Sequence, residues 1–336
     1  MRGVRIGLTG LALVCAASAR AQDGGFYAGK TVTMVVGYGV NNGYDSYARA
    51  VGRHIQNHLP GHPAIVVQNM PGAGSLAAVS YLYNSAARDG TVIGMIDQAA
   101  PLAQVMGDPG LRADVRKFNW IGRMITNAAI LFSWGGAKVQ TMRDAFDTEM
   151  IVATPGQSSR IISTLLKNML GLKLRILTGY PNSAEALLAM ERREVDAAFL
   201  PWPVLQTERP EWLAQKKIRL LSQMGTEANP GLADVPLVVD LARDKGEREI
   251  LELMTRDSAI GRALMSPPGE PGARVAEMRA AFSATMADPE FLADTRAAGL
   301  DLKPMSGEDL QAVVEKTGDV DAALVAKAKA LSAMDK

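Results

Sequence analysis

The sequence has almost no net charge. Its 336 residues include 36 Lys and Arg against 35 Asp and Glu, which gives a formal net charge of +1. A protein that binds nucleic acid through the phosphate backbone normally carries a basic excess or a long basic run, and neither is present. The composition therefore argues against nucleic acid as a partner. The length is sufficient for two domains.

Cysteine is nearly absent: Cys15 is the only one, and it lies in an N-terminal segment with the features of an export signal. Arg2 and Arg5 form a basic region, residues 6–17 are apolar, and Ala-Arg-Ala at 19–21 fits a cleavage site. The alternative is a membrane anchor, but the apolar core is shorter than the roughly 20 residues that a span requires. We expect a signal peptide over residues 1–21, cleaved near Ala21, and a periplasmic product without disulfides.

Signatures of catalysis and of cofactor binding are also missing. The three histidines, His54, His58 and His62, are clustered, and there is no G-x-S-x-G elbow and no phosphate-binding P-loop. His54 and His58 stand four residues apart, as a metal pair on a helix would, yet no third ligand is evident. Glycines at 37, 39 and 43 resemble a dinucleotide fingerprint, but the spacing is one residue too long and the expected acid is missing. We expect no enzyme activity, no cofactor and no metal; the alternative is an exported NAD-type oxidoreductase.

The stretch at 31–55, TVTMVVGYGVNNGYDSYARAVGRHI, is the most informative part of the chain. Residues 32–36 form an apolar, β-branched run typical of a strand in a parallel sheet. A loop rich in Gly and Asn follows, and a helix begins at about Tyr44. A loop of this kind lets a ligand approach the backbone, and the helix contributes free N–H groups and the positive end of its dipole. The stretch predicts an anion-binding site.

Strands and helices alternate along the remainder of the chain. Further strands are expected at 64–68, 91–96, 150–153, 174–177 and 195–200, with helices between them, and the tail from about residue 273 is mostly helical. Such alternation predicts parallel sheets, with ligands bound beyond the carboxyl ends of the strands. Loops 38–45, 71–75 and 97–100 should meet there. An extended segment at 118–135 and a returning strand at 218–223 predict two lobes joined by crossing strands.

The order of these motifs resembles that of the substrate-binding receptors of tripartite tricarboxylate transporters, often called Bug or TctC-like proteins. The resemblance rests on GYGVNNGYDSYAR at 37–49, NMPGAG at 69–74, WIG at 120–122, YPNSAEA at 180–186, VD at 195–196, DVP at 234–236 and PPGEP at 267–271. Two positions depart from the family pattern: Asn41-Asn42 stands where Gly-Gly is usual, and Arg160 where His is common. The ligand is therefore expected to differ from the usual di- and tricarboxylates.

The resemblance implies an α/β two-lobed periplasmic-binding-protein fold of type II, with two mostly parallel sheets flanked by helices. Lobe 1 is expected over residues 25–125 and 226–336, with the C-terminal helices packed on it, and lobe 2 over 126–225. The implied function is capture of a small organic acid, a di- or tricarboxylate or an aromatic carboxylate, and its presentation to a tripartite-type membrane permease. A monomer is expected. A solute sensor for a signalling partner is a further alternative.

Ligand contacts are expected from both lobes, through helix starts, side-chain donors and aromatic walls. The expected ligand-binding residues are Tyr38, Gly39, Asn41, Asn42, Gly43, Asp45, Gly72, Ala73, Gly74, Ser75, Asp97, Gly156, Gln157, Ser158, Ser159, Arg160, Asp196, Phe199 and Trp202.

Several of these residues also fit simpler structural roles. The two glycine-rich loops fit tight βα turns, and Asp45 fits a first-turn acid that complements the helix dipole. Asp196 fits a solvated charge at a strand end, Arg160 a surface ion pair, and Trp202 packing at a hinge. The sequence leaves these alternatives open.

Overall fold

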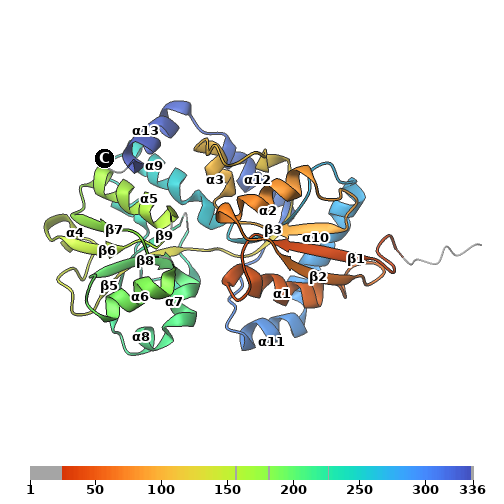
Figure 1. Cartoon of the computed structure of the whole chain (residues 1–336), viewed down its shortest axis with the longest axis horizontal. Coiled ribbons are helices and arrows are strands. Elements are labelled where there is room, and N and C mark those ends of the chain that lie inside the picture. The colour runs from red at the N-terminus through yellow and green to blue at the C-terminus, as the bar shows by residue number, and fades with distance from the viewer. Residues whose placement is uncertain (1–24, 156, 181, 226, 334–336) are drawn as a thin grey trace, which may run out of the picture.

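The computed structural model describes residues 25–155, 157–180, 182–225 and 227–333. Within them the chain forms two α/β lobes that lie side by side, each built on one β-sheet (Figure 1). The expected signal peptide at 1–21 lies outside the described residues, as do Gly156 and Thr226.

The first sheet has six strands in the order β11-β4-β10-β3-β1-β2. They are β1 (Thr31–Val36), β2 (Ala64–Asn69), β3 (Val92–Met95), β4 (Asn119–Ile125), β10 (Arg262–Ser266) and β11 (Met305–Ser306). β1 runs parallel to β2 and β3, whereas β10 runs antiparallel to β3 and β4. The carboxyl ends of β1, β2 and β3 therefore share one edge of the sheet.

Helices cover both faces of this sheet. They and the short 3-10 turns beside them are α1 (Gly43–Ile55), η1 (Ala73–Ser75), α2 (Leu76–Asn84), α3 (Ala100–Val105), η2 (Val115–Lys117), α10 (Gly272–Ala287), α11 (Pro289–Ala297) and α12 (Gly307–Gly318). Strand β1 shows why two layers are needed. Val32 and Met34 pack with α1, α10 and α11, whereas Val35 packs with α2 and α12. A strand that is apolar on both faces requires cover on both.

The second sheet has five strands in the order β7-β6-β8-β5-β9. They are β5 (Ala129–Trp134), β6 (Met150–Ala153), β7 (Leu174–Leu177), β8 (Ala197–Pro201) and β9 (Ile218–Met224). β6 is parallel to β7 and β8, and β5 is antiparallel to β8 and β9. The two-lobed α/β fold is as predicted. Each sheet is mixed rather than mostly parallel, because strands next to the interlobe connections pair antiparallel to their neighbours.

The helices of the second half of the chain mostly flank this sheet. They are α4 (Asp144–Asp147), α5 (Gln157–Leu165), the π-helical turn η3 (Leu166–Leu170), α6 (Ser183–Glu191), α7 (Trp202–Glu208), α8 (Pro210–Ala214), η4 (Pro230–Leu232), η5 (Val238–Leu241), α9 (Lys245–Thr255), η6 (Arg256–Ala259) and α13 (Ala322–Ser332). Side-chain caps set several helix starts. The Asn182 side chain accepts from the backbone N–H of Glu185, and Asp244 accepts from that of Glu247.

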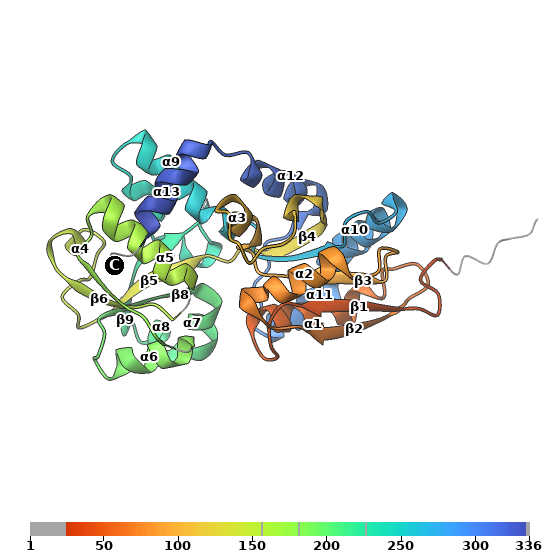
Figure 2. The ribbon, with the colours of Figure 1, turned by 45° about the horizontal axis from the view of Figure 1, so that its top comes forward.

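The last helix differs from the expectation that the C-terminal helices pack on the first lobe. α10, α11 and α12 do so, but α13 crosses to the other lobe (Figure 2). Its Ala328 shares a core with Leu165 of α5, Ile250 of α9 and Val152 of β6. The physical reason is burial of apolar surface: Leu324, Val325 and Leu331 of α13 pack against this same core. The expected lobe boundaries at 125 and 225 stay a prediction.

The connections between the lobes are held by polar contacts. The chain leaves the first sheet at β4 and enters the second at β5, and the backbone N–H of Asn127 between them donates to Ser258 O at 3.1 Å. Beyond β9, Glu227 forms an ion pair with Lys303 at 3.0 Å. Its other oxygen lies 4.0 Å from Arg123. These contacts place loops of both halves of the chain at one junction.

Candidate functional site

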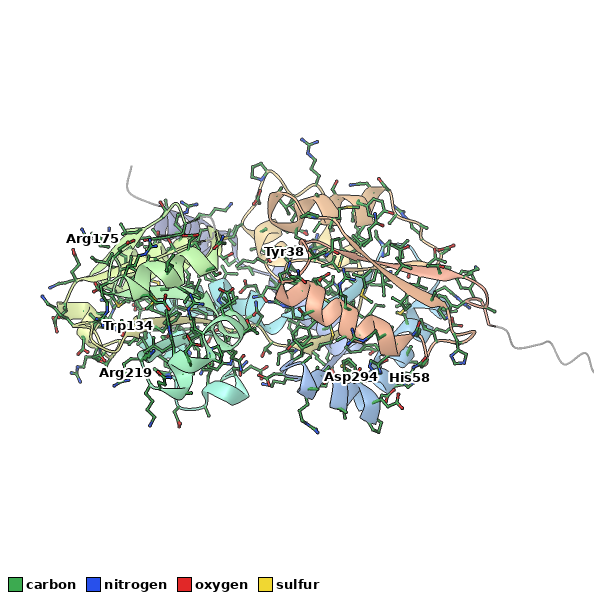
Figure 3. All side chains as sticks on the ribbon, turned by 60° about the horizontal axis from the view of Figure 1, so that its bottom comes forward. Tyr38, His58, Trp134, Arg175, Arg219 and Asp294 are labelled. Atoms are coloured by element: carbon green, nitrogen blue, oxygen red, sulfur yellow. The ribbon has the colours of Figure 1, made fainter. Side chains whose placement is uncertain are left out.

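Three loops meet at the carboxyl ends of β1, β2 and β3, as the parallel pairing requires. The Ser75 hydroxyl accepts from the backbone N–H of Asp97 at 3.1 Å, which joins the second loop to the third. The Tyr38 hydroxyl donates to Asp97 Oδ2, which joins the first loop to the third. Asn69 Nδ2 donates to Tyr38 O at 2.9 Å, which joins the end of β2 to the first loop. Figure 3 shows Tyr38 near the boundary between the lobes.

The loop between β1 and α1 is ordered by its own side chains. Asn42 caps α1: its Oδ1 accepts from the N–H groups of Tyr44 at 2.8 Å and Asp45 at 3.2 Å. Its Nδ2 donates to Gly39 O at 2.6 Å. The amide of Asn42 is thus occupied within the loop. Asn41, with φ of 61°, is exposed at the tip of the loop.

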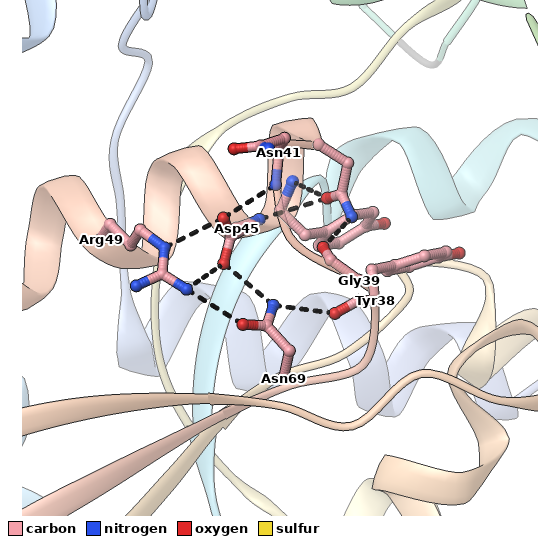
Figure 4. A network of polar contacts seen from close by, with 8 residues as sticks. Tyr38, Gly39, Asn41, Asp45, Arg49 and Asn69 are labelled. Atoms are coloured by element: carbon pink, nitrogen blue, oxygen red, sulfur yellow. Dashed lines mark hydrogen bonds and ion pairs between the residues drawn. The ribbon is translucent and has the colours of Figure 1, made fainter.

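Asp45 lies beneath this loop and holds it (Figure 4). Its carboxylate accepts from the Asn41 backbone N–H at 3.0 Å and from Asn69 Nδ2 at 2.9 Å, and it pairs with Arg49 at 2.9 Å. Burial on its own would raise the pKa of Asp45, but these hydrogen bonds outweigh it and lower the pKa. Asp45 is therefore an ionised anchor of the loop. This position agrees with a structural role and leaves a direct ligand contact untested.

The loop between β2 and α2 has an unusual backbone. Gly72, Ala73, Gly74 and Ser75 all have positive φ, although two of them are not glycine. Residues 71–74 are exposed, whereas Ser75 is buried against Gly37. Helix α2 begins without a side-chain cap, so its first N–H groups are not satisfied by one. Exposed backbone of this kind suits the approach of an anion.

A column of aromatic rings stands beside these loops. The rings of Tyr38 and Tyr44 are stacked, with an interplanar angle of 18°. Both hydroxyls donate to Asp97 Oδ2, that of Tyr44 at 3.3 Å. Burial first, and then the Asp97 charge, raise the pKa of Tyr44 far above its usual range. Both phenols are therefore fixed as hydrogen-bond donors.

Sequence reasoning missed the polar groups behind this column. Gln98, Asn127 and the pair Asp257 and Arg262 come from three separate regions of the chain and meet at the junction of the lobes. Gln98 Nε2 donates to Asn127 O at 3.3 Å. Asp257 is largely covered, and burial, followed by the Asp97 charge, raises its pKa to about 7. The guanidinium carbon of Arg262 lies 3.7 Å from the centroid of the Tyr44 ring. No pattern in the sequence links these positions.

In the second lobe the predicted residues at 157–160 begin α5, just beyond β6. Ser158 is exposed, Ser159 is buried and Arg160 is partly exposed. Thr154, before them, is anchored, since both its N–H and its hydroxyl donate to Leu177 O at 2.9 Å. Gly156 lies outside the described residues.

Three other predicted residues of the second lobe lie apart from this loop or inside the core. Asp196 precedes β8, and its Oδ2 accepts from the Ile151 N–H at 2.9 Å. It thus lies at the amino end of β8, whereas the loop at 154–160 follows the carboxyl end of the parallel β6. Phe199 is 4% exposed and Trp202 is 7% exposed, each packed in a hydrophobic cluster.

His54, in α1, and His58, in the turn just beyond it, are paired with acids rather than with each other. His54 Nε2 lies 2.9 Å from Asp294 and His58 Nε2 lies 2.9 Å from Asp288, which ties α1 to α11 and its start. Among the described residues no cluster of three or more His, Cys, Asp or Glu fits a metal ion. Likewise, no helix in the described ranges combines the length and apolar character that a membrane crossing requires.

Comparison with known proteins gives one family. Residues 47–329 match the family model described as the tripartite tricarboxylate transporter family receptor, TctC. A search of curated proteins gives no match.

Solved structures share the fold at low sequence identity. A TctC solute binding protein from Polaromonas aligns with a TM-score of 0.66 and 17% identity, over 91% of this chain and 98% of that one. Rpa4515 from R. palustris, solved with adipate, aligns with a TM-score of 0.64 and 18% identity, over 90% of this chain and 97% of that one. MatC from Rhodopseudomonas palustris, with bound malate, aligns with a TM-score of 0.60 and 19% identity, over 88% of this chain and 99% of that one.

Proposed function

This chain belongs to the tripartite tricarboxylate transporter receptor family, and from that premise we propose that it is an exported receptor that captures a small carboxylate between its two lobes. The partner would be a membrane permease of the tripartite type, to which the loaded receptor presents its ligand. Adipate and malate in two proteins of the same fold support a carboxylate as the ligand class.

One observation carries the proposal: three βα loops of the first lobe are tied into a single unit by Asp97. It receives hydrogen bonds from Tyr38 in the first loop and offers its own N–H to Ser75 in the second. Two helices, α1 and α2, start from this unit. Exposed backbone at 71–74, an uncapped helix start and the positive ends of two dipoles favour an anion at this edge of the sheet.

The candidate residues then fall into two roles. Gly39, Asn41, Gly43 and the segment 72–74 would contact the ligand, whereas Asn42 and Asp45 would act through the loop that they hold. The start of α5 in the second lobe, with Ser158, Ser159 and Arg160, would distinguish among ligands when the lobes close. We leave Asp196, Phe199 and Trp202 out of the proposed contacts.

The proposed mechanism is capture and release, with no bond made or broken. His54 and His58 are paired with acids of α11 and the residue before it, on the outer part of the first lobe, and neither stands beside the three loops. We propose no cofactor and a monomeric protein. Residues 1–21 would direct export, which places the mature chain in the periplasm.

Isothermal titration of the mature chain against a panel of di- and tricarboxylates and aromatic acids tests this function. The expected result is saturable binding of at least one acid, with the acid recovered unchanged by NMR after prolonged incubation. A ligand at 100 times its dissociation constant should also stabilise the protein by about 2.7 kcal/mol. Binding of NAD, or chemical turnover of the acid, would overturn the proposal.

A further inference from the structure

Arg262 is a buried cation whose hydrogen-bonding groups are not all satisfied within the described residues. It is the first residue of β10 and is only 5% exposed. Two of its nitrogens, Nε and Nη1, are buried and make no hydrogen bond within the described part of the chain. A buried charge is unfavourable unless it is paired and hydrogen-bonded. Arg262 therefore requires an explanation.

Arg123 provides the comparison. It lies on the neighbouring strand β4 and is 2% exposed. Its Nη1 donates to Ala259 O at 2.6 Å, and its Nε and Nη2 donate to Lys303 O at 3.3 Å and 3.2 Å. An arginine used only as structure in this sheet is thus satisfied by backbone carbonyls. Arg262, although equally buried, is not.

The guanidinium of Arg262 lies directly behind the start of α1. It stacks on Tyr44, and a Cβ added to Gly43 would lie 3.2 Å from Nη2. The cation and the positive end of the helix dipole are therefore side by side. The Tyr44 ring compensates part of the charge through a cation–π contact, but it supplies no acceptor to the unpaired N–H groups. An anion bound at this place would accept hydrogen bonds from the unpaired N–H groups of Arg262. It would also compensate the positive charge of the guanidinium and of the helix start.

Three further buried polar side chains near this junction also have atoms without partners in the described structure. Gln98 Oε1, Thr126 Oγ1 and Asn127 Oδ1 are buried without a partner among the described residues. Thr126 and Asn127 directly follow Ile125, which pairs with Arg262 in the sheet. Gln98 is linked to them, because its Nε2 donates to Asn127 O. The backbone N–H of Gln98 donates to the Tyr44 hydroxyl at 3.0 Å. The junction thus combines buried donors with buried acceptors.

We propose that Arg262 is a specificity-determining residue of the ligand site, where its guanidinium binds a carboxylate of the ligand. Gln98 and Asn127 then accept a hydrogen bond from a hydroxyl or ammonium group of the same molecule. The inferred ligand class is a small hydroxy- or amino-dicarboxylate rather than an unsubstituted one. This inference rests on the proposed receptor function and deepens it.

The first test compares three variants with the wild type by titration with malate. Arg262→Met should weaken binding on the order of 30-fold or more, since the ligand charge loses its buried partner. The malate affinity of Arg262→Lys should lie between those of wild type and Arg262→Met, because lysine keeps the charge but lacks the forked donors of arginine. In Arg262→Met the thermal midpoint without ligand should stay level or rise, because an unpaired buried charge is removed.

Arg123→Met is the matched control. It should lower the thermal midpoint, because two backbone carbonyls lose their donors, while the affinity of the folded protein stays within a few-fold of wild type. Equal malate affinity in Arg262→Met and wild type would overturn the inference and leave the receptor function standing. If wild type binds no carboxylate of the wider panel, the receptor function fails, and the inference fails with it.

The second test uses malate and succinate, which differ by one hydroxyl. Wild type should bind malate more tightly, on the order of tenfold, because the hydroxyl satisfies buried acceptors. Gln98→Leu should reduce the preference for malate over succinate, while its affinity for succinate stays within a few-fold of that of wild type. Equal affinities for the two acids in wild type would overturn the assignment of Gln98 and Asn127.

Discussion

The rings of Tyr38 and Tyr44 lie 4.6 Å apart between centroids, and both hydroxyls donate to the same carboxylate oxygen of Asp97. One tyrosine belongs to the loop after β1 and the other to the first turn of α1. The shared acceptor follows β3. This arrangement fixes two elements that are remote in the sequence against each other at the proposed site.

Replacing Tyr38 by Phe should destabilise the protein. The change removes one hydrogen bond to an ionised carboxylate, while Tyr44 and the backbone N–H of Ala99 still donate to Asp97. We expect a loss of about 1–2 kcal/mol in the free energy of unfolding, measured by urea denaturation. Tyr83→Phe is the control: its ring packs on Phe118 and its hydroxyl makes no hydrogen bond in the described structure. Equal losses in the two variants would contradict the prediction.

The stability of the protein should fall as pH rises toward neutrality, in part because of Asp257. Burial and the Asp97 charge raise the pKa of Asp257 to about 7, against 3.8 ordinarily. The folded state therefore holds a proton that the unfolded chain releases at lower pH. The stability from this proton is complete below about pH 4 and is lost as pH rises to about 7. Glu270, whose pKa is raised to about 7 mainly by burial, acts in the same direction.

Asp257→Asn isolates the first contribution. Its unfolding free energy relative to wild type should increase between pH 5 and 7, by no more than about 1.4 kcal/mol per pH unit. Asp114→Asn serves as control, because Arg116 lowers the pKa of Asp114 to about 2 and its contribution is constant over this range. A difference between Asp257→Asn and wild type that does not change with pH would refute the assignment.

Asp45 and Arg49 form an ion pair whose two members should contribute unequally. The Asp45 side chain is 3% exposed and that of Arg49 is 44% exposed. Asp45→Ala leaves the Asn41 N–H and the Asn69 amide without their acceptor. We therefore expect a loss of about 2 kcal/mol in the free energy of unfolding, together with weaker ligand binding. Arg49→Ala should lower the free energy of unfolding by less than about 1 kcal/mol, because exposed ion pairs contribute little to stability. Chemical denaturation compares the two, and similar losses would argue against Asp45 as the anchor.

Much of the first lobe could be predicted because its signals are local. The apolar run at β1 and the glycines after it predicted a strand and a tight loop, and the structure has both. The side-chain role of Asn42 is less visible. An Asn in that position suits either a ligand donor or a helix cap, and only the bonds to Tyr44 and Asp45 show that it is a cap.

Arg262 could not have been identified from the sequence. It begins an ordinary apolar strand and stands more than two hundred residues from Tyr44. Only the antiparallel insertion of β10 between β3 and β4 brings the two together. The path of α13 is hidden for the same reason, because the apolar residues of a helix do not indicate which of two lobes it covers. Tertiary placement decides both.

Gly37 should be intolerant of any side chain. A Cβ added there would lie 1.8 Å from Ser75 Oγ and 2.8 Å from Ser75 Cβ. Gly37→Ala must therefore push the second loop away from the first and break the hydrogen bond from Asp97 to Ser75. We expect a loss of about 1–3 kcal/mol in unfolding free energy together with weaker carboxylate binding.

Gly39→Ala is the matched control for stability, because a Cβ at that position meets nothing within 4 Å. The double variant Gly37→Ala with Ser75→Gly is the sharper test. It removes the side chain that collides and also the positive φ strain of Ser75, whose φ is 76°. Its stability should therefore exceed that of Gly37→Ala alone, although the hydrogen bond to Asp97 stays lost. If the second substitution instead lowers stability further by an independent amount, the two loops are not in the contact that this geometry requires.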